Sequence, residues 1–183
     1  MIPRKAFITK GTGVHKDKLA SFELALRAAR IEKFNLVCVS SILPPNCKIV
    51  PKEEGLLELK PGSIVHCVLA RNDTNEPHRL MAAAIGTAVP VENEEIYGYI
   101  SEHHSFGEEE IIAGEYAEDL AATMLATTLG IEFDAEMAWY EREQVYKASG
   151  HIFDSFHICQ TAKGDKDGKW TTIVAAMVFI TTS

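Results

Sequence analysis

Apolar and polar positions near the start of the chain follow a strand pattern, then a helical pattern, then a strand pattern again. Residues 5–9 are mostly apolar and predict a short strand, which Gly11-Thr12-Gly13 would end as a turn. Between Asp17 and Ile31 the apolar residues recur at the spacing of one helix face, which predicts an amphipathic helix. These apolar positions are Leu19, Phe22, Leu26 and Ala29. A β-branched, apolar run from Phe34 to Ile42 predicts a second strand, and Pro44-Pro45 would end it because proline cannot donate to a ladder.

The remaining pattern predicts further strands and two more helices. Lys48–Leu59 is expected to be irregular, and Ser63–Ala70 predicts a strand. Glu76–Ala88 contains good helix formers with little charge and predicts a buried helix. The later elements are a strand at Ile96–His103, a helix at Glu108–Leu129, a strand at Gln144–Ala162, a hairpin turn at Gly164–Gly168 and a strand at Trp170–Thr181. This order suggests an α/β (α+β) fold of two β-α-β-β units in one domain, 1–183, with a sheet-on-sheet core and helices outside.

Composition and charge limit the fold classes and the kinds of binding partner that fit this chain. Of 183 residues, 46% are hydrophobic and 24% are charged, which excludes disorder, collagen and coiled coil as descriptions of the whole chain. The net charge of −8 makes nucleic acid and anionic membranes poor partners, and a cationic small molecule a better one. Ten acidic residues and no Lys or Arg lie between Val91 and Leu120. Such a patch could concentrate a cationic substrate, although an acidic run is also typical of a solvated helix start.

Cysteine usage and the N-terminus predict a cytoplasmic protein. Cys38, Cys47, Cys67 and Cys159 have irregular spacings without a CxxC pair, which argues against zinc-ribbon and thioredoxin sites. No apolar stretch of the signal-peptide type follows Met1. No apolar run reaches the roughly 18 residues of a membrane span.

The most distinctive local feature of the sequence is a pair of serines at the end of a predicted hydrophobic strand. In Val39-Ser40-Ser41-Ile42-Leu43-Pro44-Pro45 the serines precede an apolar pair and two prolines. From the residues alone, the segment also fits a plain turn that serines begin and prolines enforce.

The same segment resembles the processing site of pyruvoyl-dependent arginine decarboxylases. Other stretches that recur in the order of that family are Gly11-Thr12-Gly13, Leu19–Ala25, Asn35-Leu36, Ile49-Val50-Pro51, Ala83-Ala84-Ile85, Val89-Pro90 and Gly98–Glu102. The resemblance covers most of residues 5–130 and is weak after Gly130. It implies a four-layer α/β/β/α sandwich that assembles as a homotrimer or as a hexamer of two trimers.

The resemblance implies that the chain cleaves itself between Ser40 and Ser41 into residues 1–40 and 41–183. The Ser41 hydroxyl would attack the Ser40 carbonyl, and elimination followed by hydrolysis would convert Ser41 into a covalent pyruvoyl group. This group would form a Schiff base with the substrate amine and act as an electron sink, so no separate cofactor is needed. The implied reaction is the decarboxylation of arginine to agmatine and carbon dioxide.

The resemblance also implies roles for Glu102 and Asn35. Glu102 would protonate the α-carbon after carbon dioxide leaves, and an apolar pocket would raise its pKa for that task. The residues alone also fit a surface glutamate beside two histidines. Asn35 would assist processing, but on one straight strand it lies about 20 Å from Ser41. We therefore expect either a bend or a neighbouring subunit to bring them together, unless Asn35 only satisfies a strand end.

Glu23 is the position that bears on the substrate. It lies on the predicted apolar stripe, where a carboxylate needs a partner or must reach water. The family usually has Asp there to bind the guanidinium of arginine, so Glu23 and Ser40 are the implied substrate-binding residues. Because Glu is one methylene longer, the same chemistry on another cationic amino acid is an alternative.

A second alternative is an uncleaved relative that binds amines without catalysis. No metal site is predicted, because the neighbouring His103 and His104 would point to opposite faces of a strand.

Overall fold

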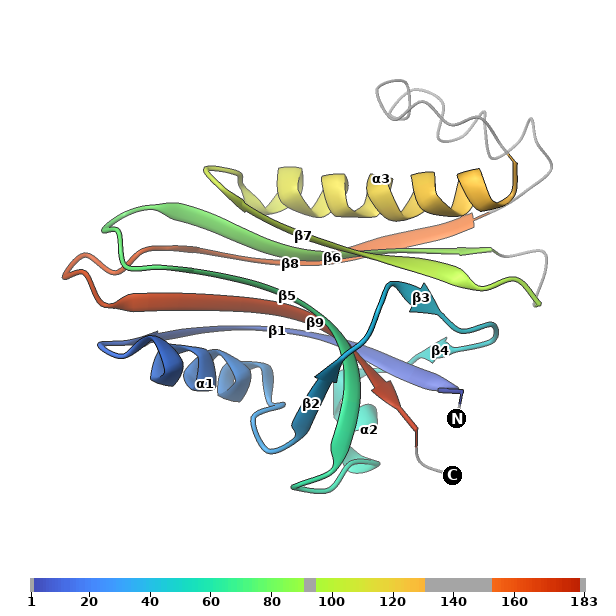
Figure 1. The fold of residues 1–183 in the computed structure, drawn as a ribbon, viewed down its shortest axis with the longest axis horizontal. Helices are drawn as coiled ribbons and strands as arrows, with labels where there is room; N and C mark the ends of the chain where they lie inside the picture. Colours follow the sequence, from blue (N-terminus) through green and yellow to red (C-terminus); the bar gives the residue numbers. More distant parts are fainter. Residues whose placement is uncertain (1, 91–94, 131–152, 182–183) are drawn as a thin grey trace.

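The computed structural model describes residues 2–90, 95–130 and 153–181, which form two β-sheets and three helices (Figure 1). In chain order the elements are β1 (Lys5–His15), α1 (Lys18–Ala29), β2 (Asn35–Cys38), β3 (Ile42–Leu43), β4 (Lys48–Ile49), α2 (Lys52–Leu57), β5 (Ile64–Thr74), β6 (Leu80–Pro90), β7 (Gly98–Phe106), α3 (Glu110–Thr128), β8 (Phe153–Lys163) and β9 (Trp170–Ile180). The expectation of an α+β sandwich is confirmed.

The first sheet has the strand order β2-β5-β9-β1-β4. Its central strand β9 pairs antiparallel with both β1 and β5. The short strands β2 and β4 lie at the edges and pair in parallel with β5 and β1. Alternate side chains of β9 enter different cores, Val174 toward α1 and Met177 toward the second sheet.

The turn expected at Gly11-Thr12-Gly13 is wrong, since β1 continues through it to His15. A Cβ on Gly11 would overlap the backbone carbonyl of Ala25, and a Cβ on Gly13 would overlap that of Ser21. The two glycines therefore let α1 lie directly against the strand, and they do not bend the chain.

The helix expected at Asp17–Ile31 is confirmed as α1, and three positions of its predicted stripe contribute to the core, since Ala29 is buried and Phe22 and Leu26 pack against the cluster. The fourth position does not. Leu19 is 78% exposed. The fully buried positions are the small residues Ser21, Ala25 and Ala29. Small side chains face the sheet because the glycines of β1 bring the helix backbone close to it.

The helix expected at Glu76–Ala88 is wrong, because Leu80–Pro90 forms β6 of the second sheet. The strand order of this sheet is β3-β7-β6-β8, and β6 pairs antiparallel with both neighbours. Ala83 faces the first sheet and Ala84 faces α3. Because both faces of β6 are buried, its sequence lacks the apolar–polar alternation of a half-exposed strand.

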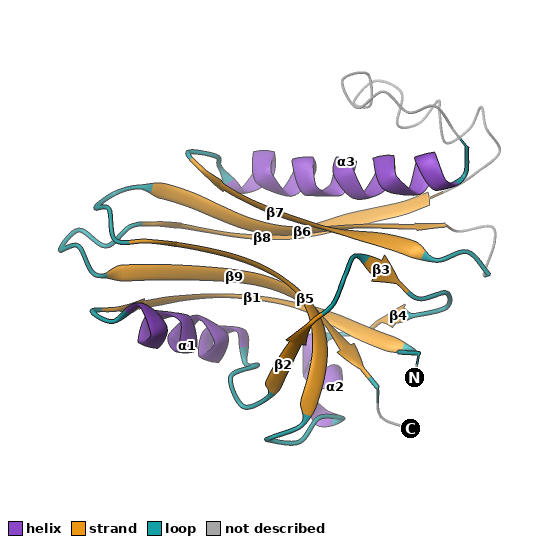
Figure 2. Ribbon diagram, viewed as in Figure 1, coloured by secondary structure: helices purple, strands orange, loops and turns teal. Residues whose placement is uncertain are grey.

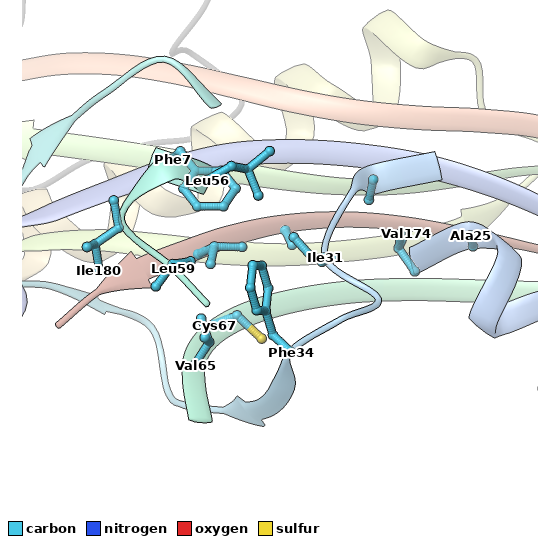
Figure 3. Packing of buried hydrophobic residues seen from close by; sticks show 13 residues of the cluster. Phe7, Ala25, Ile31, Phe34, Leu56, Leu59, Val65, Cys67, Val174 and Ile180 are labelled. Atoms are coloured by element: carbon cyan, nitrogen blue, oxygen red, sulfur yellow. The ribbon is translucent and has the colours of Figure 1, made fainter. Parts of the chain in front are cut away.

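Apolar clusters join the layers seen in Figure 2. One cluster fills the space between α1, α2 and the outer face of the first sheet, and Figure 3 shows Phe7, Ile31 and Phe34 within it. A second cluster lies between the two sheets and includes Leu43 and Ile100. Two smaller clusters pack α3 against the outer face of the second sheet.

Three further expectations need correction or restriction. The irregular segment expected at Lys48–Leu59 contains β4 and α2. Of the strand expected at Gln144–Ala162, residues 144–152 lie outside the described residues, and β8 begins at Phe153. The strand expected at Trp170–Thr181 is confirmed as β9, but it pairs in the first sheet, so the second of the two expected β-α-β-β units is divided between the sheets.

Within the described ranges, no helix combines the length and apolar character needed to cross a membrane.

Candidate active site

Ser40 and Ser41 lie where the chain crosses from one sheet to the other. The strand expected from Phe34 to Ile42 is wrong as one element, because β2 ends at Cys38 and β3 begins at Ile42 in the second sheet. Figure 1 shows the connection between β2 and β3 rising from the first sheet to the second. The serine pair is therefore in a short connection whose ends are both held by strand pairing.

Backbone hydrogen bonds fix this connection on both sides of the Ser40–Ser41 peptide bond. The N–H of Ile42 donates to the carbonyl oxygen of Ser40 at 3.0 Å, which closes a three-residue turn around Ser41. The N–H of Ile100 in β7 donates to the carbonyl oxygen of Ser41 at 2.7 Å. On the upstream side, the N–H of Val39 donates to the carbonyl oxygen of Cys67 at 2.9 Å. The carbonyls of both serines are thus polarised by backbone donors.

Glu102 lies close to Ser41 in the register of the second sheet. Ile42 pairs with Tyr99, so the next position places Ser41 opposite Ile100. Glu102 is two residues further along β7, which makes it a diagonal neighbour of Ser41 at about 7–8 Å between Cα atoms. Desolvation by its surroundings raises the pKa of the Glu102 carboxyl, although the residue is exposed at the surface, and His104 opposes this shift. A carboxylic acid of raised pKa next to Ser41 can hold a proton nearer to neutral pH than an ordinary glutamate.

A cavity of about 470 Å³ opens beside the connection. Its lining includes Ser40, Ile42 and Phe179, together with His66 of β5. His66 was not among the residues that the sequence singled out. A histidine inside the apolar run of the predicted strand Ser63–Ala70 was the available signal, since such a strand offers few reasons for an imidazole.

Asn35 stays at the opposite end of β2 from the serine pair. Its Nδ2 donates to the carbonyl oxygen of Gly62 at 3.0 Å, and its N–H donates to that of Ser63 at 2.9 Å. The pairing of β2 with β5 continues to Val39, so no bend within β2 returns Asn35 to Ser41. Of the two routes expected for Asn35, only the neighbouring subunit stays open as a prediction.

Glu23 is on α1, which covers the outer face of the first sheet (Figure 2). Its Oε1 accepts hydrogen bonds from Arg27, at 2.6 Å from Nη2 and 3.2 Å from Nε. The partner that the carboxylate needs is therefore a guanidinium of the same helix. Within the described part of the chain, Glu23 has no hydrogen bond or ion pair with Ser41.

The chemistry of the site rests on hydroxyl, imidazole and carboxyl groups. Ser41 offers a nucleophile next to a polarised carbonyl, Glu102 offers an acid, and the peptide bond between the serines is held on both sides. Among the described residues, no group of three or more His, Cys, Asp or Glu side chains could hold a metal ion. Fold and site together define an α+β sandwich protein with a serine pair and a neighbouring carboxylic acid at the junction of its two sheets.

Comparison with known proteins gives the family. Residues 5–183 match the family model described as pyruvoyl-dependent arginine decarboxylase. Over 181 residues, the chain is 90% identical to "Pyruvoyl-dependent arginine decarboxylase 2" of Methanosarcina mazei, covering 99% of this chain and 98% of the relative. It is 74% identical over 180 residues to the pyruvoyl-dependent arginine decarboxylase of Methanococcoides burtonii, covering 98% and 99%. A probable pyruvoyl-dependent arginine decarboxylase of Chloroherpeton thalassium is 60% identical over 179 residues, covering 98% of each chain. The chain belongs to the pyruvoyl-dependent arginine decarboxylase family.

Proposed function

We propose that the chain cleaves itself between Ser40 and Ser41 and then decarboxylates arginine to agmatine and carbon dioxide. The observation that carries the proposal is the position of Ser40-Ser41 in a chain that matches the family model over residues 5–183. The pair lies in the connection between the two sheets, where Ile42 and Ile100 donate to its carbonyls. Glu102, with a raised pKa, is its diagonal neighbour on β7.

Self-cleavage uses groups of this chain alone. The Ser41 Oγ attacks the Ser40 carbonyl carbon, the C–N bond breaks, and an ester forms while the hydroxyl proton passes to the released amine. Loss of the Ser41 Cα proton then breaks the Cβ–Oγ bond and releases Ser40 as a carboxylate, which leaves dehydroalanine at position 41. Water converts dehydroalanine into a pyruvoyl group and ammonia. The turn closed by the N–H of Ile42 supports the first step, because it keeps the Ser40 carbonyl next to the attacking residue.

The residues around Ser41 fit the covalent group that would replace it. A pyruvoyl group supplies a ketone carbonyl that binds the substrate amine and withdraws electrons. The N–H of Ile100 holds the backbone carbonyl of residue 41, and therefore fixes that end of the group. Glu102 holds the proton that the α-carbon of the product requires, and its raised pKa supports this role near neutral pH.

Glu23 and Asn35 support a shared site in a homotrimer. Glu23 lies on α1 and Asn35 at the start of β2, and neither is joined to Ser41 by a hydrogen bond within the described residues. We propose that Glu23 of one subunit binds the guanidinium of the substrate held at Ser41 of a neighbour. Mixing Ser41→Ala chains with Glu23→Gln chains then restores activity, because some mixed sites contain both intact residues. A mixture as inactive as its parts would show that the two residues act within one chain.

A denaturing mass spectrum of the purified chain tests the proposed function. We expect two species, residues 1–40 and the 143 residues from 41 to 183, with the larger one lighter by one ammonia than simple hydrolysis gives. Borohydride reduction in the presence of arginine should add the mass of a reduced amine adduct to the larger species. Ser41→Ala should remain one chain without activity. A wild-type chain that stays whole after long incubation would overturn the proposal.

The rates at which different amino acids are decarboxylated identify the substrate. Arginine should be decarboxylated faster than ornithine, lysine or histidine at equal concentration. A faster reaction with another of these amino acids would mean that Glu23, in the place of the usual Asp, has changed the substrate.

A further inference from the structure

His66 is directed into the cavity that Ser40 also lines. It lies opposite Val37 in the parallel pairing of β5 with β2, three residues before Ser40. In β5, alternate side chains share a face, and Val68 of this set lies in the cluster between the sheets. Asn72, further along the same face, donates to the carbonyl oxygen of Ser105 in the second sheet at 2.8 Å. The imidazole therefore points from the first sheet toward the junction that the Ser40–Ser41 bond crosses.

The imidazole of His66 is half-buried, and within the described residues it makes no hydrogen bond and no ion pair. Its ring nitrogens are not among the buried side-chain atoms that lack a partner, so they are open to the cavity and free to donate a further hydrogen bond. The phenol of Tyr97, which also lines the cavity, already interacts with Tyr99, and this interaction raises the pKa of Tyr97. Besides Ser40 itself, His66 and Thr181 are the polar side chains of the lining that make no hydrogen bond within the described residues. Of these two, His66 belongs to the strand that pairs with β2 as far as Val39, next to Ser40.

Self-cleavage places negative charge on Ser40 twice. Attack by the Ser41 hydroxyl turns the Ser40 carbonyl oxygen into an oxyanion, and the later elimination releases Ser40 as a carboxylate. The N–H of Ile42 already donates to this oxygen at 3.0 Å. A carbonyl oxygen has two lone pairs, so one further donor completes its hydrogen bonding.

We propose that His66 is this second donor: its ring N–H binds the Ser40 oxygen as negative charge develops during self-cleavage. The inference rests on the proposed function and adds a residue to its processing step. Together, the Ile42 N–H and the His66 ring form a two-donor oxyanion site, and such donors act most strongly where water is partly excluded. After cleavage, the same ring would retain the Ser40 carboxylate in the cavity.

The rate at which newly folded chain divides into two species tests the proposal. Full-length chain made by cell-free synthesis is sampled over time by mass spectrometry, as wild type and with His66→Ala or His66→Asn. Loss of one oxyanion donor slows such reactions by about a hundredfold or more, so His66→Ala should show a loss of that size. His66→Asn keeps an N–H donor and should cleave within about tenfold of wild type. Added imidazole should accelerate His66→Ala, because the cavity of about 470 Å³ has room for it.

His78→Asn is the matched control. His78 is exposed in the connection between β5 and β6 and has a φ of 62°, which asparagine tolerates. This variant should cleave at the wild-type rate. Thermal melting of each variant, made in the Ser41→Ala background, checks that the fold is retained.

The outcomes separate this inference from the proposed function. If wild type cleaves and His66→Ala cleaves equally fast, the donor role is wrong and the proposed function stands. A different result is that His66→Ala and His66→Asn cleave equally slowly, that imidazole does not accelerate His66→Ala, and that both variants melt early. In that case His66 supports the fold and is not a donor. If wild type itself never cleaves, the proposed function and the inference are both overturned.

Discussion

Replacing Glu118 by alanine should destabilise the fold by about 3 kcal/mol, because it removes two hydrogen bonds of a buried carboxylate. Glu118 is 9% exposed, on the face of α3 that packs against the second sheet. Its Oε1 accepts a hydrogen bond from Ser155 Oγ at 2.6 Å, and its Oε2 is hydrogen-bonded to His157 Nδ1 at 2.6 Å. The helix face around it is rich in alanine, so this carboxylate joins α3 to β8 where apolar contacts are small.

The magnitude follows from the two hydrogen bonds. Each bond to a charged group contributes about 1.5–3 kcal/mol, and alanine removes both while leaving Ser155 and His157 without this partner. The His157 side chain is 31% exposed, so water recovers part of its loss. The sum is therefore expected near the lower end of the range, at about 3 kcal/mol.

Urea unfolding followed by circular dichroism measures the effect. The Ser41→Ala background keeps the protein as one chain, so that cleavage does not complicate the transition. Glu115→Ala is the control, because Glu115 is half-buried on the same helix and has no hydrogen bond or ion pair within the described residues. The control should change the free energy of unfolding by less than about 0.5 kcal/mol. Equal effects of Glu118→Ala and Glu115→Ala would refute the reasoning. In a double-mutant cycle, Glu118→Ala and His157→Ala should be strongly non-additive.

Three further outcomes are expected. Because Glu102 has a raised pKa and donates a proton, the rate of decarboxylation should be retained at low pH and should fall as the pH rises through that pKa. Glu102→Gln should still cleave itself normally, but it should decarboxylate slowly and without this fall. Normal turnover in Glu102→Gln would show that Glu102 is not the proton donor. Burial raises the pKa of Cys47 to about 11, so at pH 8 roughly one thiol in a thousand is ionised. Iodoacetamide should therefore label the exposed Cys38 long before Cys47, and peptide mass mapping that finds equal labelling would contradict this. Thr87 is fully buried with a hydroxyl that has no partner among the described residues, so Thr87→Val should raise the free energy of unfolding by about 1 kcal/mol in urea titrations, and a loss of stability would mean that the hydroxyl is satisfied.

The sequence predicted elements well where one face is solvated or where β-branched residues mark a buried strand, as in β9, and poorly where a buried strand is rich in alanine. The helix α1 has an exposed side, and its existence was predicted correctly. The strand β6 is covered on one face by α3 and on the other by the first sheet, so its alanine-rich run has no alternation and was assigned as a helix. Gly11 and Gly13 were interpreted as a turn because glycine in a sequence signals a bend, whereas here the missing Cβ atoms make room for α1.

The candidate site was found partly by local pattern and partly by resemblance. The serine pair before Pro44-Pro45 stands out in the sequence, but its position in the connection between sheets depends on β3 leaving β2 for the second sheet. The proximity of Glu102 to Ser41 depends on the register of β3 with β7, which no local pattern encodes. His66 escaped notice because its importance arises from a cavity formed by distant segments.

The position of the serine pair decides how the two products of cleavage depend on each other. Residues 1–40 contain β1, α1 and β2, and within the described residues all the strand partners of β1 and β2 belong to residues 41–183. Since β1 lies between β9 and β4, removing the smaller piece would open the first sheet in its interior. The two pieces are therefore obligate complements: neither contains a complete core, and synthesis as a single chain guarantees their one-to-one assembly before the connection is lost.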